Sequence, residues 1–362
     1  ADSTQGVYGA GSTAGNTPVE PGDDDTRPLT AAAGTIWFSA PAIPANAGET
    51  VNLSVYNVQV RAAVTAPNSE ITWSSEELEI QDGALVTPPE AGVYPLTAHY
   101  RNLTKTIYLI AKNPEDDEYV LYYEDFEDAS MEDFSIVEQA MGSSANIENG
   151  RLVLSAAGSS SDVVRVLLPR FLDDFGDYRI TANVQMTDYA EPTRWFSIMY
   201  RIQNHDFPYQ QLALRGNATA DNGVELVQKT RSGEWLYHST AAYTEDLDPE
   251  KTYEVTLDVY GYHAEGAIDG TNMITTYGLT EYLPGRVGFQ VCGSEVEIDE
   301  IKITVDFYQA QLYHSSCADV REIESGIALA PAMIYEIRSA EDLDAIRTNS
   351  PVAAIMTIQQ DG

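Results

Sequence analysis

Cysteine is nearly absent from this chain, with Cys292 and Cys317 as the two in 362 residues. Two cysteines without CxxC spacing are too few for a disulfide framework and do not form a thiolate zinc pattern. The five histidines are scattered, with no HxxxH or HxH pair to start a metal centre. These absences argue against metal-hydrolase and thiol-redox chemistry and leave open one disulfide between the two cysteines.

Basic residues are also scarce, because 20 Lys and Arg stand against 56 Asp and Glu, for a formal net charge of −36. Such a surface repels the phosphate backbone of nucleic acid, so we expect no nucleic-acid partner. The same excess supplies many oxygen ligands of the kind that Ca²⁺ prefers. A structural calcium ion is therefore the first cofactor to consider.

Long apolar runs are missing as well. No stretch reaches the roughly 18 residues needed to span a bilayer, so the sequence predicts no transmembrane segment. Phosphate-binding glycine loops, dinucleotide fingerprints and GxSxG elbows are not found either. Because the chain starts at Ala1 without a basic-then-apolar leader, we expect a processed product or a fragment.

Shifts in composition divide the chain. Residues 1–33 are mostly Gly, Ser, Thr, Pro and Asp, which predicts a disordered linker. Such a linker points weakly to the cell exterior, and a processing remnant is an equal alternative. Residues 34–113 contain short alternating apolar runs between turn residues, which indicates successive strands. The acidic break NPEDDE at 113–118 then predicts a domain boundary.

Three segments of the first domain carry a resemblance to a known family. They are TWSS at 72–75, GALVTP at 83–88 and AGVYPLTA at 91–98. In order and spacing they resemble the bacterial Ig-like surface domains. The resemblance implies an Ig-like β-sandwich over 34–113, with Trp73 filling the space between its sheets.

The second domain, predicted over 119–307, has at least ten strand-like segments and no convincing amphipathic helix. Its segments include YEDFED at 123–128, NGRLVL at 149–154, WFSIMYR at 195–201, AIDG at 267–270 and PGRVGF at 284–289. Together they resemble the concanavalin-like lectin and glucanase (laminin-G-like) domains over about half the chain. The resemblance implies a jelly-roll β-sandwich, a fold that hosts lectins, hydrolases and inert spacers alike.

Two sets of acidic residues are candidates for catalysis or metal binding. Glu295, Glu297 and Asp299 share one strand face, as the carboxylates of laminarinase-type glucanases do. Their order is Glu, Glu, Asp rather than Glu, Asp, Glu, so we expect a closing strand and no catalytic residues. The second set brings Asp299 together with acids from the opening of the domain as a structural calcium site: Glu124, Asp125 and Glu127. Solvated edge acids are the alternative.

Sugar binding needs exposed rings and planar polar groups on one face. The candidates lie on successive strand-like runs: Trp195, Arg201, Tyr209, Gln211, Arg215 and Trp235. Alternation turns about half of such residues into the core, and we expect Arg201, Gln211 and Arg215 to face outward. A hairpin at 203–208 would bring Arg201 near Tyr209. A packed sandwich with polar decoration is the alternative.

The C-terminal segment differs in pattern. Residues 328–337 predict a strand, 339–346 a short capped helix and 352–358 a buried strand, so 325–362 is interpreted as the start of an α/β domain. It resembles the beginning of a glycerophosphodiester phosphodiesterase-like barrel, and we expect the chain to continue beyond Gly362. A small α/β cap on the sandwich is the alternative.

Taken as a whole, the sequence predicts an all-β protein made of an Ig-like sandwich and a concanavalin-like jelly roll, with a short α/β segment. We expect an extracellular or cell-surface location and a non-catalytic module that binds glycans or other surface ligands. The alternatives are the N-terminal accessory half of a secreted hydrolase, phosphodiesterase-like or glycosidase, and a pure spacer.

Overall fold

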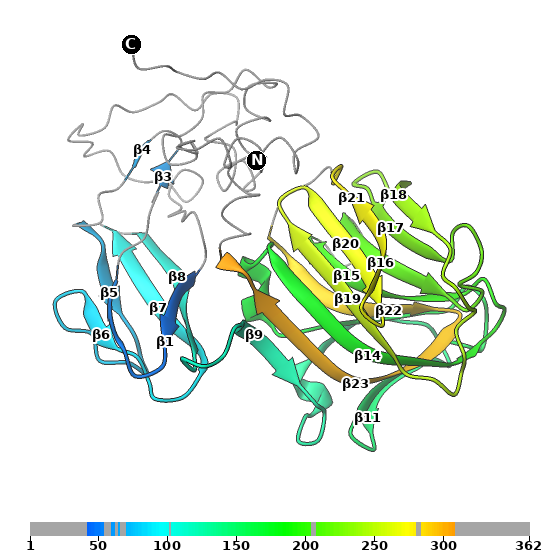
Figure 1. The fold of residues 1–362 in the computed structure, drawn as a ribbon, viewed down its shortest axis with the longest axis horizontal. Helices are drawn as coiled ribbons and strands as arrows, with labels where there is room; N and C mark the ends of the chain where they lie inside the picture. The colour runs from blue at the N-terminus through cyan, green and yellow to red at the C-terminus, as the bar shows by residue number, and fades with distance from the viewer. Residues whose placement is uncertain are drawn as a thin grey trace, which may run out of the picture. The chain divides into compact units, whose positions relative to one another are not determined.

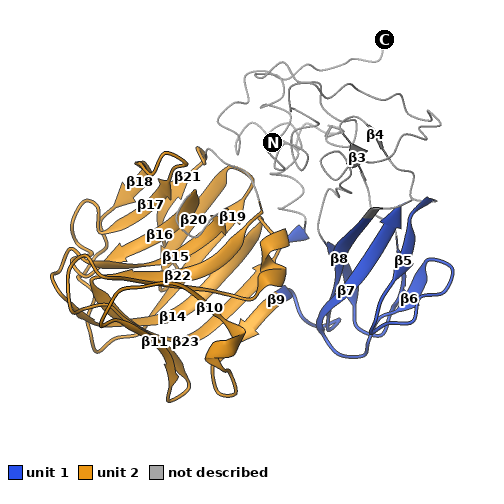
Figure 2. Ribbon diagram, turned by 180° about the vertical axis from the view of Figure 1, so that it is seen from behind, with its two compact units in different colours: residues 1–120, 306–362 blue, residues 121–305 orange. Residues whose placement is uncertain are grey.

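The computed structural model describes residues 42–307, apart from 54–58, 62–63, 66–69, 101–102, 204–207 and 280–283. The chain divides into two compact units, one of residues 1–120 with 306–362 and one of residues 121–305 (Figure 2). The regular elements are strands and short 3-10 helices, which confirms the all-β class for the described residues. The predicted linker at 1–33 and α/β segment at 325–362 lie outside the described residues.

The first unit contains a four-stranded sheet in the order β1-β8-β7-β5, in which β1 runs parallel to β8 and the other pairs are antiparallel. Two small ribbons, β2 with β6 and β3 with β4, complete it. The strands are β1 Ala42–Asn46, β2 Thr50–Asn52, β3 Gln59–Arg61, β4 Val64–Thr65, β5 Thr72–Ser74, β6 Ala84–Val86, β7 Gly92–Tyr100 and β8 Leu103–Lys112.

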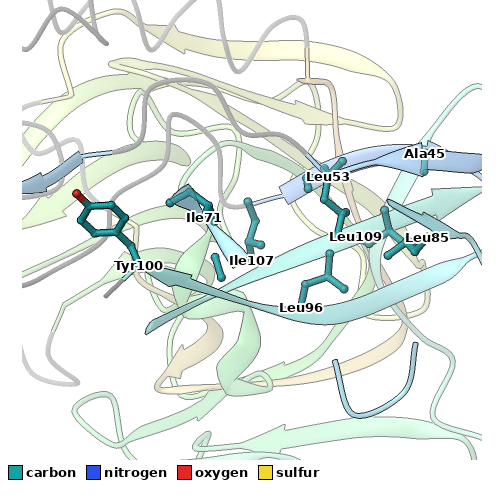
Figure 3. Packing of buried hydrophobic residues seen from close by; sticks show 10 residues of the cluster. Ala45, Leu53, Ile71, Leu85, Leu96, Tyr100, Ile107 and Leu109 are labelled. Atoms are coloured by element: carbon teal, nitrogen blue, oxygen red, sulfur yellow. The ribbon is translucent and has the colours of Figure 1, made fainter. Parts of the chain in front are cut away.

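Apolar side chains of these strands meet in one cluster (Figure 3). Leu96 from β7 and Ile107 and Leu109 from β8 are fully buried there. Trp73 packs against the cluster but stays partly exposed, so it borders the core rather than filling its centre. The Ig-like assignment of this unit remains a prediction.

The second unit is a sandwich of two antiparallel sheets (Figure 1). The seven-stranded sheet has the order β10-β13-β22-β15-β16-β17-β18, and the eight-stranded sheet has the order β11-β12-β23-β14-β19-β20-β21, with β9 pairing β23. The first sheet consists of β10 Ser135–Gln139, β13 Val163–Leu167, β15 Trp195–Ile202, β16 Tyr209–Arg215, β17 Val224–Lys229, β18 Trp235–Ala241 and β22 Arg286–Cys292. The second consists of β9 Tyr119–Glu124, β11 Ser144–Glu148, β12 Arg151–Ser155, β14 Tyr178–Tyr189, β19 Tyr253–Tyr260, β20 His263–Ile268, β21 Thr271–Thr276 and β23 Ser294–Val305.

Two 3-10 helices, η2 Met131–Asp133 and η3 Arg170–Asp174, lie in connections of this unit. Asp269 and Gly270 form the turn that joins β20 to β21, and both residues have positive φ, 49° and 72°. Positive φ at both central residues is what a type I′ hairpin turn requires. Among the described residues, no helix has the length and apolarity needed to cross a membrane.

Close approach of the two sheets fixes which way β16 faces. A Cβ placed on Gly266 of β20 would lie 2.7 Å from Leu212 Cδ1 and 2.8 Å from Ile274 Cγ2. The side chain of Leu212 therefore points into the space between the sheets, and glycine at 266 leaves room for it. Since side chains alternate along a strand, Tyr209, Gln211 and Arg215 belong to the opposite face.

Candidate functional site

The face of the seven-stranded sheet that is turned away from the eight-stranded sheet is here called the outer face. Residues paired in register share a face, so one row crosses it from β10 to β17. This row consists of Glu138, Arg165, Gln290, Ser197, Ala213 and Glu225. Its polar members from Arg165 to Glu225 are at most 4% exposed. The central strands of the sheet are thus buried on both faces, with polar groups on the outer one.

Arg165 is the central charge of this row. Its Nε donates to Gln290 Oε1 at 2.6 Å, and its Nη1 lies 3.2 Å from Glu138 Oε2. The guanidinium also lies 5.0 Å from the centroid of the Tyr209 ring. Burial raises the pKa of Tyr209, and the nearby Arg165 charge acts against that rise. The cation is therefore held by a carboxylate, an amide and an aromatic ring.

A second ion pair occupies the β16 and β17 side of the outer face. Arg215 Nη2 lies 3.0 Å from both carboxylate oxygens of Glu225, and its other nitrogens donate to the backbone oxygens of Asn222 and Thr193. Arg215 therefore has its donors occupied within the fold. Nearby on the same face, Ser197 Oγ donates to Gln211 Oε1 at 3.3 Å.

Aromatic rings emerge where the outer face reaches the edge strand β18. Trp235 and Tyr237 are 39% and 54% exposed, and they pair in register with Lys229 and Val227 of β17. We call these two side chains the aromatic rim. The Trp235 ring meets Tyr209 edge-on, with centroids 6.2 Å apart, and Lys229 Nζ lies 4.3 Å from its centroid. Exposed apolar rings thus stand beside a buried polar row.

The outward orientation expected for Arg201 is wrong. Its side chain is 1% exposed; Nε donates to Gly176 O at 2.8 Å, Nη1 donates to Gly261 O at 2.7 Å and Nη2 lies 3.3 Å from Asp177 Oδ1. The pairing of β15 with β22 shifts between Met199 and Ile202, and Arg201 has a φ of 50°. Alternation fails at such an irregularity, so the expected orientation does not follow.

The other predicted sugar-binding residues divide by exposure. Gln211 and Arg215 do belong to the outer face, but Gln211 is buried and Arg215 is half-buried in its ion pair. Tyr209 is buried beneath the rim, and Trp195 is half-buried beside Arg215 in register. Trp235 alone of the predicted set presents a large ring surface to solvent.

The structure does not gather the predicted calcium ligands into one cluster. Glu124 and Asp125 accept backbone N–H groups from Phe126 and Glu127 within their own turn, at 2.8 and 3.3 Å. Asp299 Oδ1 lies 3.3 Å from Arg151 Nε. In the described part of the chain no three acidic, histidine or cysteine side chains group as metal ligands would. An arginine stands beside Asp299 where calcium was predicted, and calcium binding stays a prediction.

The remaining carboxylates of β23 lie on the eight-stranded sheet. Glu295 accepts from Ser155 Oγ at 2.5 Å and from Thr187 Oγ1 at 3.0 Å, and Glu297 lies 2.7 Å from Arg151 Nη1. These carboxylates are held by residues of the two neighbouring strands β12 and β14. This arrangement assigns them a part in holding the sheet together.

Sequence reasoning missed Glu138, Arg165, Gln290 and Lys229. A signal existed for Arg165, because it is a lone cation in the apolar run VVRVL at 163–167. A charge within a strand of that kind is expected to be paired when the strand is buried. Glu138 and Gln290 meet it from distant segments, so no local pattern reveals them.

The disulfide that the sequence leaves open is not seen: the thiol of Cys292 forms no disulfide in the structure, whereas Cys317 lies outside the described residues.

Comparison with known protein families finds no match, and comparison with curated proteins finds none either. Solved structures do resemble this chain. A carbohydrate-binding module, CBM66, from Bacillus subtilis is 12% identical, with a TM-score of 0.39, over 48% of this chain and 95% of that one. The Bacillus licheniformis β-glucanase is 11% identical, with a TM-score of 0.38, over 51% and 97%. The laminarinase from Rhodothermus marinus is 9% identical, with a TM-score of 0.36, over 51% and 96%.

Proposed function

We propose that the second unit is a non-catalytic glycan-binding module whose site is the outer face at β16, β17 and β18. The observation that carries the proposal is the aromatic rim, Trp235 and Tyr237, exposed on the same face as a buried row of polar side chains. Apolar faces of sugar rings stack on aromatic side chains, while their hydroxyls need planar hydrogen-bonding partners. The aromatic rim offers the stacking surface, and polar side chains lie on the same face.

The exposure of the rim also separates binding from mere packing. The buried ring of Tyr209 packs against its neighbours on the outer face, whereas rings that are 39% and 54% exposed leave part of their surface without protein contacts. Trp235 is further held by Tyr209 on one side, so little side-chain freedom is lost when a ligand stacks on it. A rigid, exposed ring is suited to sugar binding.

The proposal includes an extracellular or cell-surface location, which agrees with the acidic composition without depending on it. A glycan displayed outside the cell is the partner that such a module would meet. Glycan-dependent retention of the intact protein on cells, lost after Trp235→Ala, is the expected result for this part of the proposal.

The site is tested in two steps. A glycan array first identifies sugars that bind the full chain, and the chain and its variants are then titrated with those sugars. Trp235→Ala and Tyr237→Ala are expected to weaken binding about tenfold each, roughly 1.4 kcal/mol, because each removes one stacking surface. Tyr123→Ala is the matched control, since Tyr123 is 52% exposed on β9 of the other sheet. If the control loses as much glycan affinity as the rim variants, or if no variant loses affinity, the site lies elsewhere.

A further inference from the structure

Lys229 has an unusual environment on the outer face. The other cations of the face have carboxylate partners, namely Glu138 for Arg165, Glu225 for Arg215 and Asp173 for Arg286. Among the residues that the structure describes, no carboxylate lies within ion-pairing distance of Lys229. Its ammonium group instead lies over the ring of Trp235.

We propose that the glycan site is selective for acidic sugars, such as uronic acids, and that Lys229 determines this selectivity. The inference rests on the proposed function, because it names the class of sugar that the aromatic rim takes. It adds one charged contact, from the Lys229 ammonium to a carboxylate on the sugar stacked at Trp235. Such a contact is charge-assisted and stronger than a hydrogen bond between neutral groups.

Any ligand that stacks on Trp235 must displace the Lys229 ammonium from its ring. A sugar that stacks on the face of Trp235 competes with the Lys229 ammonium, which lies 4.3 Å from the ring centroid. A neutral sugar removes this cation–π contact and gives the lysine nothing of equal strength in return. An acidic sugar accepts the displaced ammonium with its carboxylate. The same movement therefore disfavours neutral sugars and favours acidic ones.

The net charge of the chain acts in the opposite direction at long range. With 56 acidic and 20 basic residues, the chain repels anions on approach. At physiological ionic strength this repulsion is largely screened beyond about 8 Å, whereas a direct contact is not. Moderate salt is thus expected to speed association of an acidic sugar while leaving most of the contact energy intact.

Matched oligosaccharides test the inference. The full chain is titrated with oligomers of galacturonic, glucuronic and mannuronic acid and with their methyl esters, which have the same rings without charge. For at least one pair, the acid is expected to bind about two- to fivefold more tightly than its ester, as for an exposed ion pair. Lys229→Gln should remove this difference by weakening the acid alone.

Lys302→Gln is the control, because it removes the same charge from the eight-stranded sheet, where Lys302 pairs in register with Thr181. It should keep the preference of the parent. Esters that bind as tightly as the acids, or a preference that survives Lys229→Gln, would overturn the inference. Binding of neutral glycans alone would leave the proposed function standing, whereas no glycan binding at all, in these titrations or the array, would refute both.

Discussion

Replacing Arg201 by Met is expected to destabilise the second unit by about 3 kcal/mol. The side chain is 1% exposed, and its polar contacts include Gly176, Gly261 and Asp177. Removing one partner of a buried ion pair typically costs about 3–5 kcal/mol. The lower value applies because the Asp177 side chain is 16% exposed and keeps a bond from the backbone N–H of Gly261.

Conservative variants separate the contributions at this position. Lysine keeps the charge but not the fork of donors, so Arg201→Lys should fall between the parent and Arg201→Met. A φ of 50° is strained for residues with a Cβ, by about 1 kcal/mol or more. Arg201→Gly should therefore be less destabilising than Arg201→Ala by about that amount, although glycine has the more flexible unfolded state.

Urea unfolding followed by circular dichroism and tryptophan fluorescence measures these effects. The chain has two compact units, so two transitions are expected and must be assigned before free energies are compared. Leu96→Ala, in the fully buried core of the first unit, should shift the other transition and serves for assignment. A loss below 1 kcal/mol for Arg201→Met would refute the reasoning about a buried, fully used guanidinium.

Three further predictions concern other positions. Burial lowers the pKa of His263 from its ordinary 6.5, against the effect of Glu265 at 3.0 Å, so the unfolded state binds more protons once the pH falls below about 6.5. The free energy of unfolding should therefore decrease as pH falls through that range, and it should decrease less steeply in His263→Phe than in the parent. His238→Gln serves as the comparison, because burial also lowers the pKa of His238. Gly288→Ala should be more destabilising than Gly266→Ala, since its Cβ would lie 2.4 Å from the backbone oxygen of Val166 whereas that of Gly266 meets side chains; thermal melts that rank them in reverse would contradict this. If Arg151 holds Asp299, EDTA should leave the melting temperature unchanged, and a rise with added Ca²⁺ that Asp299→Asn abolishes would instead support the calcium site.

The strand content and several turns were predictable because they depend on local patterns. Alternation along residues 178–186 matches the burial of β14, and glycine at 288 lies at a close approach to the neighbouring strand. The orientation of Arg201 was not predictable, because a register shift and a positive φ break the alternation there. The buried polar row was not predictable for a different reason. Arg165 contacts Gln290 through strand pairing across 125 residues, and no short window of sequence reveals such a contact.

The candidate site was predictable only in part. Trp235 was identified from its residue type and strand, and its exposure follows from the position of β18 at the end of the sheet. Sequence alone does not tell an edge strand from a central one. The same pattern therefore makes Tyr209 and Gln211 candidates for sugar binding, although both are buried. Knowing the order of strands would have separated them.

Strand order also constrains how the second unit is made. β22 lies between β13 and β15, and β23 lies between β12 and β14, so the last two strands of the unit are inserted into the middle of both sheets. Until residues 286–305 are available, the seven-stranded sheet consists of two pieces, and the eight-stranded sheet consists of two pieces and the unpaired strand β9. Their exposed inner edges are prone to wrong pairing. A growing chain must therefore hold some 165 preceding residues of this unit without a completed sheet, and folding must await the last strands. Chaperone contact during synthesis, or slow folding dominated by late long-range pairing, is the physiological cost of this topology.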